Sequence, residues 1–140
     1  MDSYFLRIKK ISLDDLDRIV LFIEETTEKL EVHSEFIPDV VVTTMEAVTN
    51  ILKHGYRDEP GLVEIEIKRK EKALVIVFRD LAETFDPTVR PAPDTSLPLE
   101  QRPMGGLGVY LMNHFMDELV HQTQAQGGNE LICIKKDIFP

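Results

Sequence analysis

The segments Glu46-Ala-Val-Thr-Asn-Ile-Leu-Lys-His-Gly55 and Gly105-Gly-Leu-Gly-Val-Tyr-Leu-Met112 carry the most information about this chain. In the first, a carboxylate and a carboxamide stand four positions apart in a predicted helix, so Glu46 and Asn50 share one helical face. The second segment is a glycine-rich turn that opens another helix, where backbone N–H groups and the helix dipole favour an anion. Together the two segments predict a site for a phosphorylated ligand and a divalent metal.

In the functional interpretation of the first segment, the carbonyl oxygen of Asn50 binds Mg²⁺, a hard cation that takes few protein oxygens beside phosphate. Glu46, one turn earlier, is then placed to act as a general base. The alternative is that both residues belong to the exposed polar stripe that any amphipathic surface helix carries. The glycines also have a structural alternative, because they could simply relieve crowding where a loop enters a helix.

Asp80 ends an apolar stretch, residues 74–78, that is typical of a central strand. As a residue at the end of a strand it is either an ordinary turn former or the acceptor for an exocyclic amine, such as that of adenine. The second interpretation would select adenine over guanine.

The hydrophobic patterns predict strands and helices on both sides of these segments. The helix that carries Glu46 spans residues 38–55, with an apolar face and a polar face that includes Asn50 and His54. The other predicted helices span residues 13–30 and 108–119, and the predicted strands span 4–11, 63–68, 73–78, 120–124 and 131–135. Strands grouped in hairpins favour an α+β fold: a two-layer sandwich with a mostly antiparallel, mixed sheet covered on one face by about three helices.

Length and charge narrow the class of protein. At 140 residues with 43% hydrophobic content, the chain is expected to form a single domain over residues 1–140. A net charge of −9 argues against a nucleic-acid or anionic-membrane partner. The N-terminus has no pattern of a signal peptide and no apolar run approaches membrane-spanning length, so we expect a cytoplasmic protein. The lone Cys133 is expected to be a reduced, structural thiol.

Three motifs in this order and spacing resemble the N, G1 and G2 boxes of the Bergerat-fold ATPases, the histidine-kinase-like ATPase superfamily. They are Glu46-xxx-Asn50 with His54-Gly55-Tyr56, Asp80-xxxx-Phe85-Asp86, and the glycine-rich 105–112 segment. Over nearly its whole length the chain is most similar to the small, stand-alone anti-sigma-factor serine/threonine kinases of bacteria.

The resemblance implies a role for each motif residue. Glu46 would be the general base for a serine of an anti-anti-sigma (STAS-type) partner, Asn50 would chelate Mg²⁺, and Asp80 would bind the adenine of ATP. Residues 87–104 would form the lid over ATP, and Arg102 would reach its terminal phosphate. The remaining residues implied at the nucleotide are His54, Ala82, Phe85, Gly105, Gly106, Leu107 and Gly108. The family also implies a homodimer that holds a sigma factor captive.

Two departures from the family pattern concern the adenine end of the site. The G1 box usually reads Asp-x-Gly but here reads Asp80-Leu81-Ala82, and Asn129-Glu130 follows Gly128 where the family often has Gly-Thr. If position 82 needs a glycine conformation, nucleotide affinity is lowered. Three hypotheses therefore stay open: a kinase that also binds a regulatory partner, a non-catalytic partner-switching module, and an ATPase without a protein acceptor.

Overall fold

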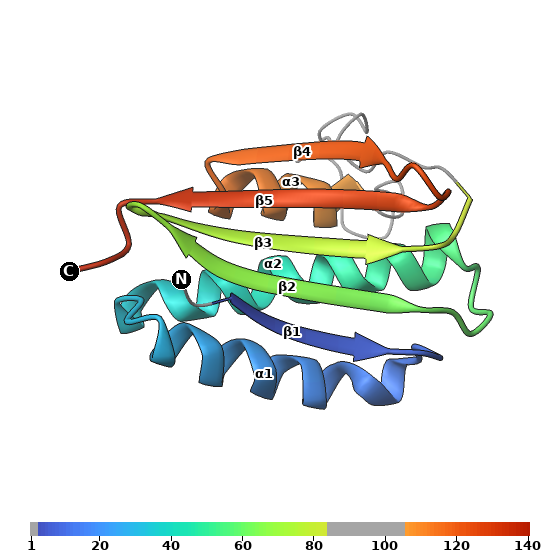
Figure 1. Ribbon diagram of the computed structural model, residues 1–140, viewed down its shortest axis with the longest axis horizontal. Helices are drawn as coiled ribbons and strands as arrows, with labels where there is room; N and C mark the ends of the chain where they lie inside the picture. The colour runs from blue at the N-terminus through green and yellow to red at the C-terminus, as the bar shows by residue number, and fades with distance from the viewer. Residues whose placement is uncertain (1–2, 84–105) are drawn as a thin grey trace.

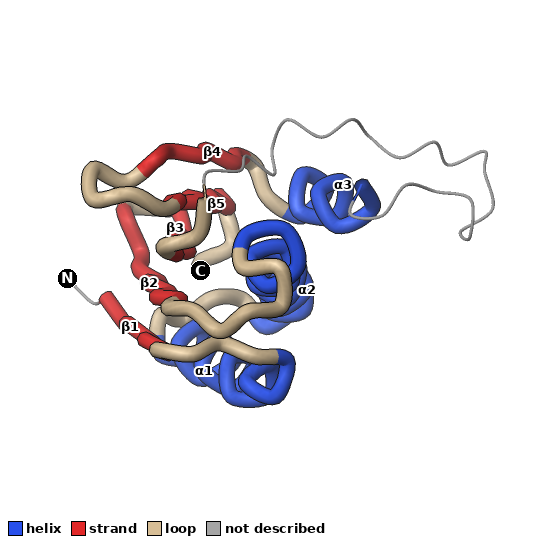
Figure 2. Tube along the Cα trace, turned by 90° about the vertical axis from the view of Figure 1, so that its right-hand side faces the viewer, coloured by secondary structure: helices blue, strands red, loops and turns tan. Residues whose placement is uncertain are grey.

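The computed structural model of the chain describes residues 3–83 and 106–140, which fold into two layers (Figure 1). After the first strand, the strands follow one another in hairpin pairs, as the sequence predicts. The helices are α1 (Leu16–Lys29), α2 (Ile37–Asn50) and α3 (Gly106–Phe115), and the strands are β1 (Ser3–Ile8), β2 (Val63–Lys70), β3 (Ala73–Asp80), β4 (Glu118–Thr123) and β5 (Asn129–Lys136). The side view shows α1, α2 and α3 on the same face of the sheet (Figure 2). The predicted α+β two-layer architecture is confirmed.

The strands form one sheet in the order β1-β2-β3-β5-β4, and each pair of neighbours in this part of the chain is antiparallel. The apolar strand β3 lies in the centre and β1 lies at an edge, as the sequence pattern predicts. β5 lies between β3 and β4, so the last hairpin places Asn129 directly opposite Asp80. This register brings together two residues that are far apart in the sequence.

Local sequence signals explain where the helices begin. The first helical segment starts as a 3₁₀ turn, Leu13–Asp15, behind a capping box at Ser12. The Ser12 N–H donates to Asp15 Oδ2 at 2.9 Å, and the Asp14 N–H donates to Ser12 Oγ at 3.3 Å. Pro38 occupies the first turn of α2, where its missing N–H costs nothing. None of the helices within the described ranges combines the length and apolar character needed to cross a membrane.

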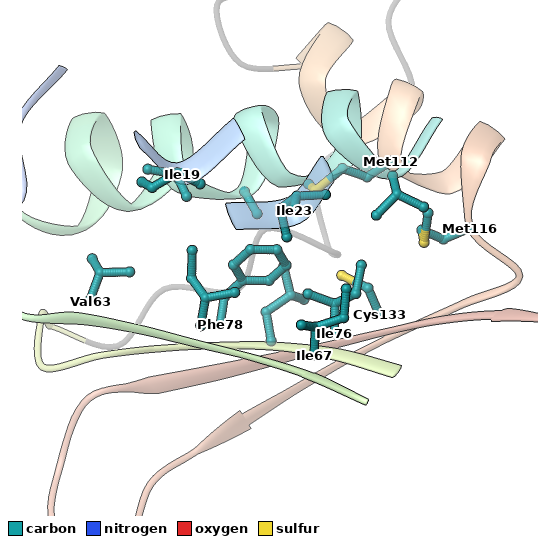
Figure 3. Packing of buried hydrophobic residues seen from close by; sticks show 14 of the residues in the cluster. Ile19, Ile23, Val63, Ile67, Ile76, Phe78, Met112, Met116 and Cys133 are labelled. Carbon is teal, nitrogen blue, oxygen red and sulfur yellow. The ribbon is translucent and has the colours of Figure 1, made fainter. Parts of the chain in front are cut away.

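The hydrophobic core fills the space between the helices and the sheet (Figure 3). Ile19 and Ile23 of α1 and Met112 of α3 are fully buried against Phe78 of β3, which is 1% exposed. Cys133 is also fully buried there, and burial raises the pKa of its thiol well above the ordinary value. The expectation of a structural thiol is consistent with this position.

The structure differs from the predicted helices in two places. The helix over 38–55 changes at Asn50 into a π-helical turn, Ile51–Gly55, a local widening that occurs frequently at functional sites. The last helix ends at Phe115 rather than 119, because the Asp117 N–H bonds the Ile134 carbonyl and Leu119 pairs with Cys133 in the sheet. Leu119 packs against the core, and an apolar residue is expected there in a helix and in a strand alike, so its hydrophobicity does not distinguish the two.

Arg79 lies on the sheet face opposite the helices and binds three carboxylates. Its guanidinium nitrogens donate to Glu130 Oε2 at 2.7 Å, Glu64 Oε1 at 2.9 Å and Glu66 Oε1 at 2.8 Å. Burial alone would raise the pKa of Glu66, but hydrogen bonds from Arg79 and Ser3 outweigh it and hold that pKa below its ordinary value. Arg79 is the cation that these three carboxylates share, while Lys68 lies 3.5 Å from Glu66 and Arg7 lies 4.0 Å from Glu64.

Replacing Arg79 with methionine is expected to lower the free energy of unfolding by about 1–3 kcal/mol near neutral pH, because three carboxylates lose the cation between them and only the longer pairs with Lys68 and Arg7 remain. Since the folded-state pKa of Glu66 is depressed, its stabilisation is present above the unfolded-state pKa and is lost as pH falls through the folded-state pKa. Urea unfolding should therefore show a smaller difference in the free energy of unfolding between the wild type and Arg79→Met in acid than at neutral pH.

Lys136→Met, which removes an exposed pair with Glu118, is the matched control and should change the free energy of unfolding by less than about 0.5 kcal/mol. An equal loss in both variants would contradict the role of the cluster.

Candidate functional site

Helix α2 brings Glu46 to the start of α3. The Glu46 side chain is half-buried and packs on Gly108, where a β-carbon would overlap Glu46 Oε2 and lie 3.3 Å from the carboxyl carbon. Gly108 belongs to the first turn of α3, whose backbone begins helical geometry at Gly106. The predicted carboxylate and the predicted glycine-rich turn are therefore in contact.

Asn50 lies one turn beyond Glu46 and is 6% exposed, although its helical position groups it with the polar face of α2. It lines a cavity of about 10 Å³ between α2 and the sheet. The lining residues are Ala47, Asn50, Ile51, Phe78, Asp80, His121, Asn129 and Leu131. In the described part of the chain, Asn50 Nδ2 is one of two buried side-chain polar atoms without a hydrogen-bond partner. A buried, unpaired amide is rare in proteins and points to a ligand or water at this place.

Asp80 forms the other end of this cavity and is 2% exposed. Its Oδ1 accepts hydrogen bonds from the Ala82 N–H at 2.9 Å and from Asn129 Nδ2 at 3.0 Å. Burial raises the pKa of the Asp80 carboxyl, and the hydrogen bonds from Asn129 and Ala82 offset only part of that effect. An additional donor, such as an exocyclic amine, would stabilise the charged form further.

The loop after β3 accommodates alanine at position 82. Positive φ angles among the described non-glycine residues occur only at Glu31, Arg57, Asp58, Glu71 and Asp137, so the Ala82 backbone does not need glycine. Its methyl group is buried and its N–H closes a turn on Asp80. The departure from the family's glycine is therefore not a source of backbone strain here.

Tyr56 and Gln124 support this loop; sequence reasoning assigned Gln124 no role and placed Tyr56 in the first motif without a contact of its own. The Tyr56 hydroxyl accepts from the Leu81 N–H at 2.8 Å and donates to the Leu62 carbonyl at 2.6 Å. Gln124 Nε2 donates to the Asp80 carbonyl at 2.9 Å. The available signal for Tyr56 was its place directly after the His54-Gly55 pair.

Gly128 is required by its position in the β4–β5 hairpin. Its φ is +90°, and a β-carbon there would overlap the Asp80 carbonyl oxygen and lie 2.8 Å from the Leu81 Cα. The hairpin predicted from Gly127-Gly128-Asn129 is confirmed, and it packs directly on the loop after β3.

The remaining predicted site residues fall into two groups. His54 lies half-buried in the π-helical turn, one turn beyond Asn50, and Gly106 and Leu107 lie in the first turn of α3. Phe85, Arg102, Gly105 and the predicted lid, 87–104, lie outside the described residues. The structure thus brings together Glu46 with Gly108, and Asn50 with Asp80.

The residues around Asn50 fit a magnesium ion held together with phosphate. The Asn50 carboxamide offers a hard oxygen donor beside an unpaired N–H group. Within residues 3–83 and 106–140, no three His, Cys, Asp or Glu side chains gather into a metal cluster. A single protein oxygen suits Mg²⁺, which fills its other positions with water and substrate phosphates.

Comparisons with known proteins agree with this arrangement. The family model of the histidine kinase-like ATPase domain matches residues 10–135. The anti-sigma F factor of Clostridium kluyveri (strain ATCC 8527) is 32% identical over 102 residues, which cover 71% of this chain and 70% of the relative. The anti-sigma F factor of Clostridium novyi (strain NT) is 34% identical over 116 residues, covering 77% and 76%.

The serine-protein kinase RsbW of Bacillus cereus (strain AH820) is 36% identical over 88 residues, covering 59% of this chain and 54% of that kinase. The chain thus spans about half the length of this relative. The family model and the two anti-sigma F factors each cover more than two thirds of the chain. The chain therefore belongs to the histidine kinase-like ATPase family, within the group of the anti-sigma-factor serine/threonine kinases.

Proposed function

We propose that the protein is an ATP- and Mg²⁺-dependent serine/threonine kinase that phosphorylates an anti-anti-sigma partner and sequesters a sigma factor. The observation that carries the proposal is the placement of Glu46 on the glycine-rich start of α3, while Asn50 and Asp80 line one buried cavity. A general base and an anion site lie at one end of α2, and an acceptor for adenine lies across the cavity.

In the proposed reaction, the Glu46 carboxylate accepts the proton of the acceptor's serine hydroxyl. The serine oxygen forms a bond to the γ-phosphorus while the bond to the β–γ bridging oxygen breaks, which leaves phosphoserine and ADP. Asn50 would hold Mg²⁺, whose charge offsets that of the phosphates. Asp80 would orient the adenine ring, and this would fix the position of the γ-phosphate relative to Glu46.

The partners follow from the names of the relatives. Two relatives are anti-sigma F factors, which supports a sigma factor as the captive, and a third is a serine-protein kinase, which supports a serine-containing acceptor. An anti-anti-sigma protein of the STAS type as that acceptor rests on the resemblance of the motifs to the family. A homodimer as the sigma-binding form is part of the same proposal.

A second candidate is a non-catalytic partner-switching module. It is favoured by the small volume of the cavity, about 10 Å³, and by the hydrogen bond that the Asn129 amide already donates to Asp80. Against it stands Glu46, since a module that only binds partners needs no carboxylate at the phosphate end of the site. An ATPase without a protein acceptor is the third candidate.

Incubation with γ-labelled ATP, Mg²⁺ and anti-anti-sigma proteins encoded beside this protein separates the three. We expect label on one serine of an acceptor, and no label when that serine is replaced by alanine. Release of labelled phosphate without a labelled protein would instead identify an ATPase. Formation of neither product would favour the partner-switching module, which binds nucleotide weakly or not at all, and failure to bind ATP would reject both enzymes.

A further inference from the structure

We infer that the side chains of Asn129 and His121 form a latch over the base end of the pocket, which must open before a nucleotide binds, given the nucleotide-binding function proposed above. The latch includes these two side chains, the contact between them and the hydrogen bonds of Asn129 to Asp80 and Glu83. It makes Asn129 the residue that controls access to Asp80.

The latch is built from hydrogen bonds that use the whole Asn129 amide. Asn129 is 3% exposed, and its Nδ2 donates to Asp80 Oδ1 and to the Glu83 carbonyl, both at 3.0 Å. His121 Nε2 lies 2.8 Å from Asn129 Oδ1. Because Oδ1 can only accept, this contact requires a proton on His121 Nε2. Asn129 is therefore held from both sides, by β3 and its following loop and by β4.

The cavity that residues 3–83 and 106–140 leave beside Asp80 is smaller than an adenine ring. A cavity of about 10 Å³ holds roughly one water molecule, whereas pockets for small ligands are on the order of 300–1,000 Å³. The unpaired, buried Nδ2 of Asn50 lines the same cavity. The cavity thus has the polar lining of a ligand site and lacks its volume.

The latch side chains differ from the other lining groups in lying on the last hairpin, outside the hydrophobic core cluster. Phe78, Ile51 and Leu131 belong to the core cluster and are closely packed by neighbouring side chains. His121 is half-buried on β4, the edge strand, and Asn129 directly follows the Gly127-Gly128 turn. Displacement of this hairpin end would widen the cavity without disturbing the core.

Opening exchanges internal hydrogen bonds for bonds to the ligand. The Asn129 amide donates to Asp80 Oδ1, so the carboxylate proposed to accept from an exocyclic amine already has an internal side-chain donor. When only the open fraction of molecules binds, the apparent dissociation constant rises in inverse proportion to that fraction. Weakening the latch should therefore tighten ATP binding by about tenfold, the effect expected from the loss of one or two internal hydrogen bonds.

Isothermal titration calorimetry with ATP and Mg²⁺ tests the latch in the full chain. His121→Ala removes the donor that holds Asn129, and Asn129→Ser shortens the side chain so that it no longer spans from Asp80 to Glu83. Gln122→Ala is the matched control, since Gln122 is the exposed neighbour of His121 on β4 and its side chain donates to Glu130, away from Asp80 and Asn129. Circular dichroism verifies that each variant is folded, and His121→Ala serves if Asn129→Ser is not.

The expected result is about tenfold tighter binding by the latch variants and unchanged binding by Gln122→Ala. Equal or weaker binding by the latch variants, with wild-type protein binding ATP, would overturn the latch and leave the proposed function standing. If no folded variant and no wild-type protein binds ATP, the proposed function fails, and the latch fails with it. A ¹⁵N spectrum of wild-type protein without ATP adds a separate check, because a His121 ring unprotonated at Nε2 would also overturn the latch.

Discussion

Replacing Glu46 with glutamine is expected to slow phosphoryl transfer to the acceptor serine by about 10²–10⁴-fold, because the amide cannot accept the hydroxyl proton. Glutamine has nearly the same shape as glutamate, so the packing of this side chain on Gly108 should survive. The affinity for ATP should change by less than about twofold, because a group that acts only in the chemical step contributes little to ground-state binding. Single-turnover transfer of labelled phosphate gives the rate, and calorimetry gives the affinity.

Glu25→Gln is the matched control for this prediction, since it removes the same charge from an exposed position on α1. Its transfer rate should equal that of the wild type. A Glu46→Gln protein that transfers phosphate at the wild-type rate would remove Glu46 from the mechanism. A variant that loses ATP binding as well would instead give Glu46 a structural part in the pocket.

Replacing Phe78 with alanine is expected to lower the free energy of unfolding by about 3–5 kcal/mol. Phe78 is 1% exposed at the centre of the sheet, and truncation leaves a cavity beneath the helices that surrounding side chains fill only in part (Figure 3). A domain of this size has a total stability of roughly 5–15 kcal/mol, so the loss is a large share of it. Urea unfolding followed by circular dichroism measures the change.

Leu21→Ala provides the comparison for this core substitution. Leu21 is 55% exposed on α1, so its removal should change the free energy of unfolding by less than about 0.5 kcal/mol. A loss below about 1 kcal/mol for Phe78→Ala would mean that the core around β3 is loosely packed.

The architecture was predictable because each element has its own periodic or turn signal. Alternating residues around Ile65 identified β2, and the Gly127-Gly128 turn identified the last hairpin. The π-helical turn after Asn50 was not predictable, since the hydrophobic spacing of an α-helix and of one wider turn differ by a single position. The boundary between α3 and β4 near Leu119 was also ambiguous, because that side chain packs against the core whether it belongs to a helix or to a strand.

The part of the candidate site around Glu46 and Asn50 was predictable from the sequence, and the part around Asp80 was less so. Glu46 and Asn50 lie on one helix, so their spacing alone placed them together. The bonds of Asn129 to Asp80 and His121 depend on the register of β5 between β3 and β4, which a single sequence does not specify. The burial of Asn50 also arises from tertiary packing, since helical periodicity alone assigns it to the polar face.

The insertion of β5 between β3 and β4 has a consequence for synthesis of the protein. During translation, β3 leaves the ribosome well before β5, so one edge of the most apolar strand stays unpaired for the time needed to make about fifty further residues. An unpaired apolar edge is a template for aggregation, and the nascent chain is exposed to that hazard until its final hairpin docks. Asp80 also meets Asn129 only at that step, so the cavity that the two residues line is the last part of the candidate site to form.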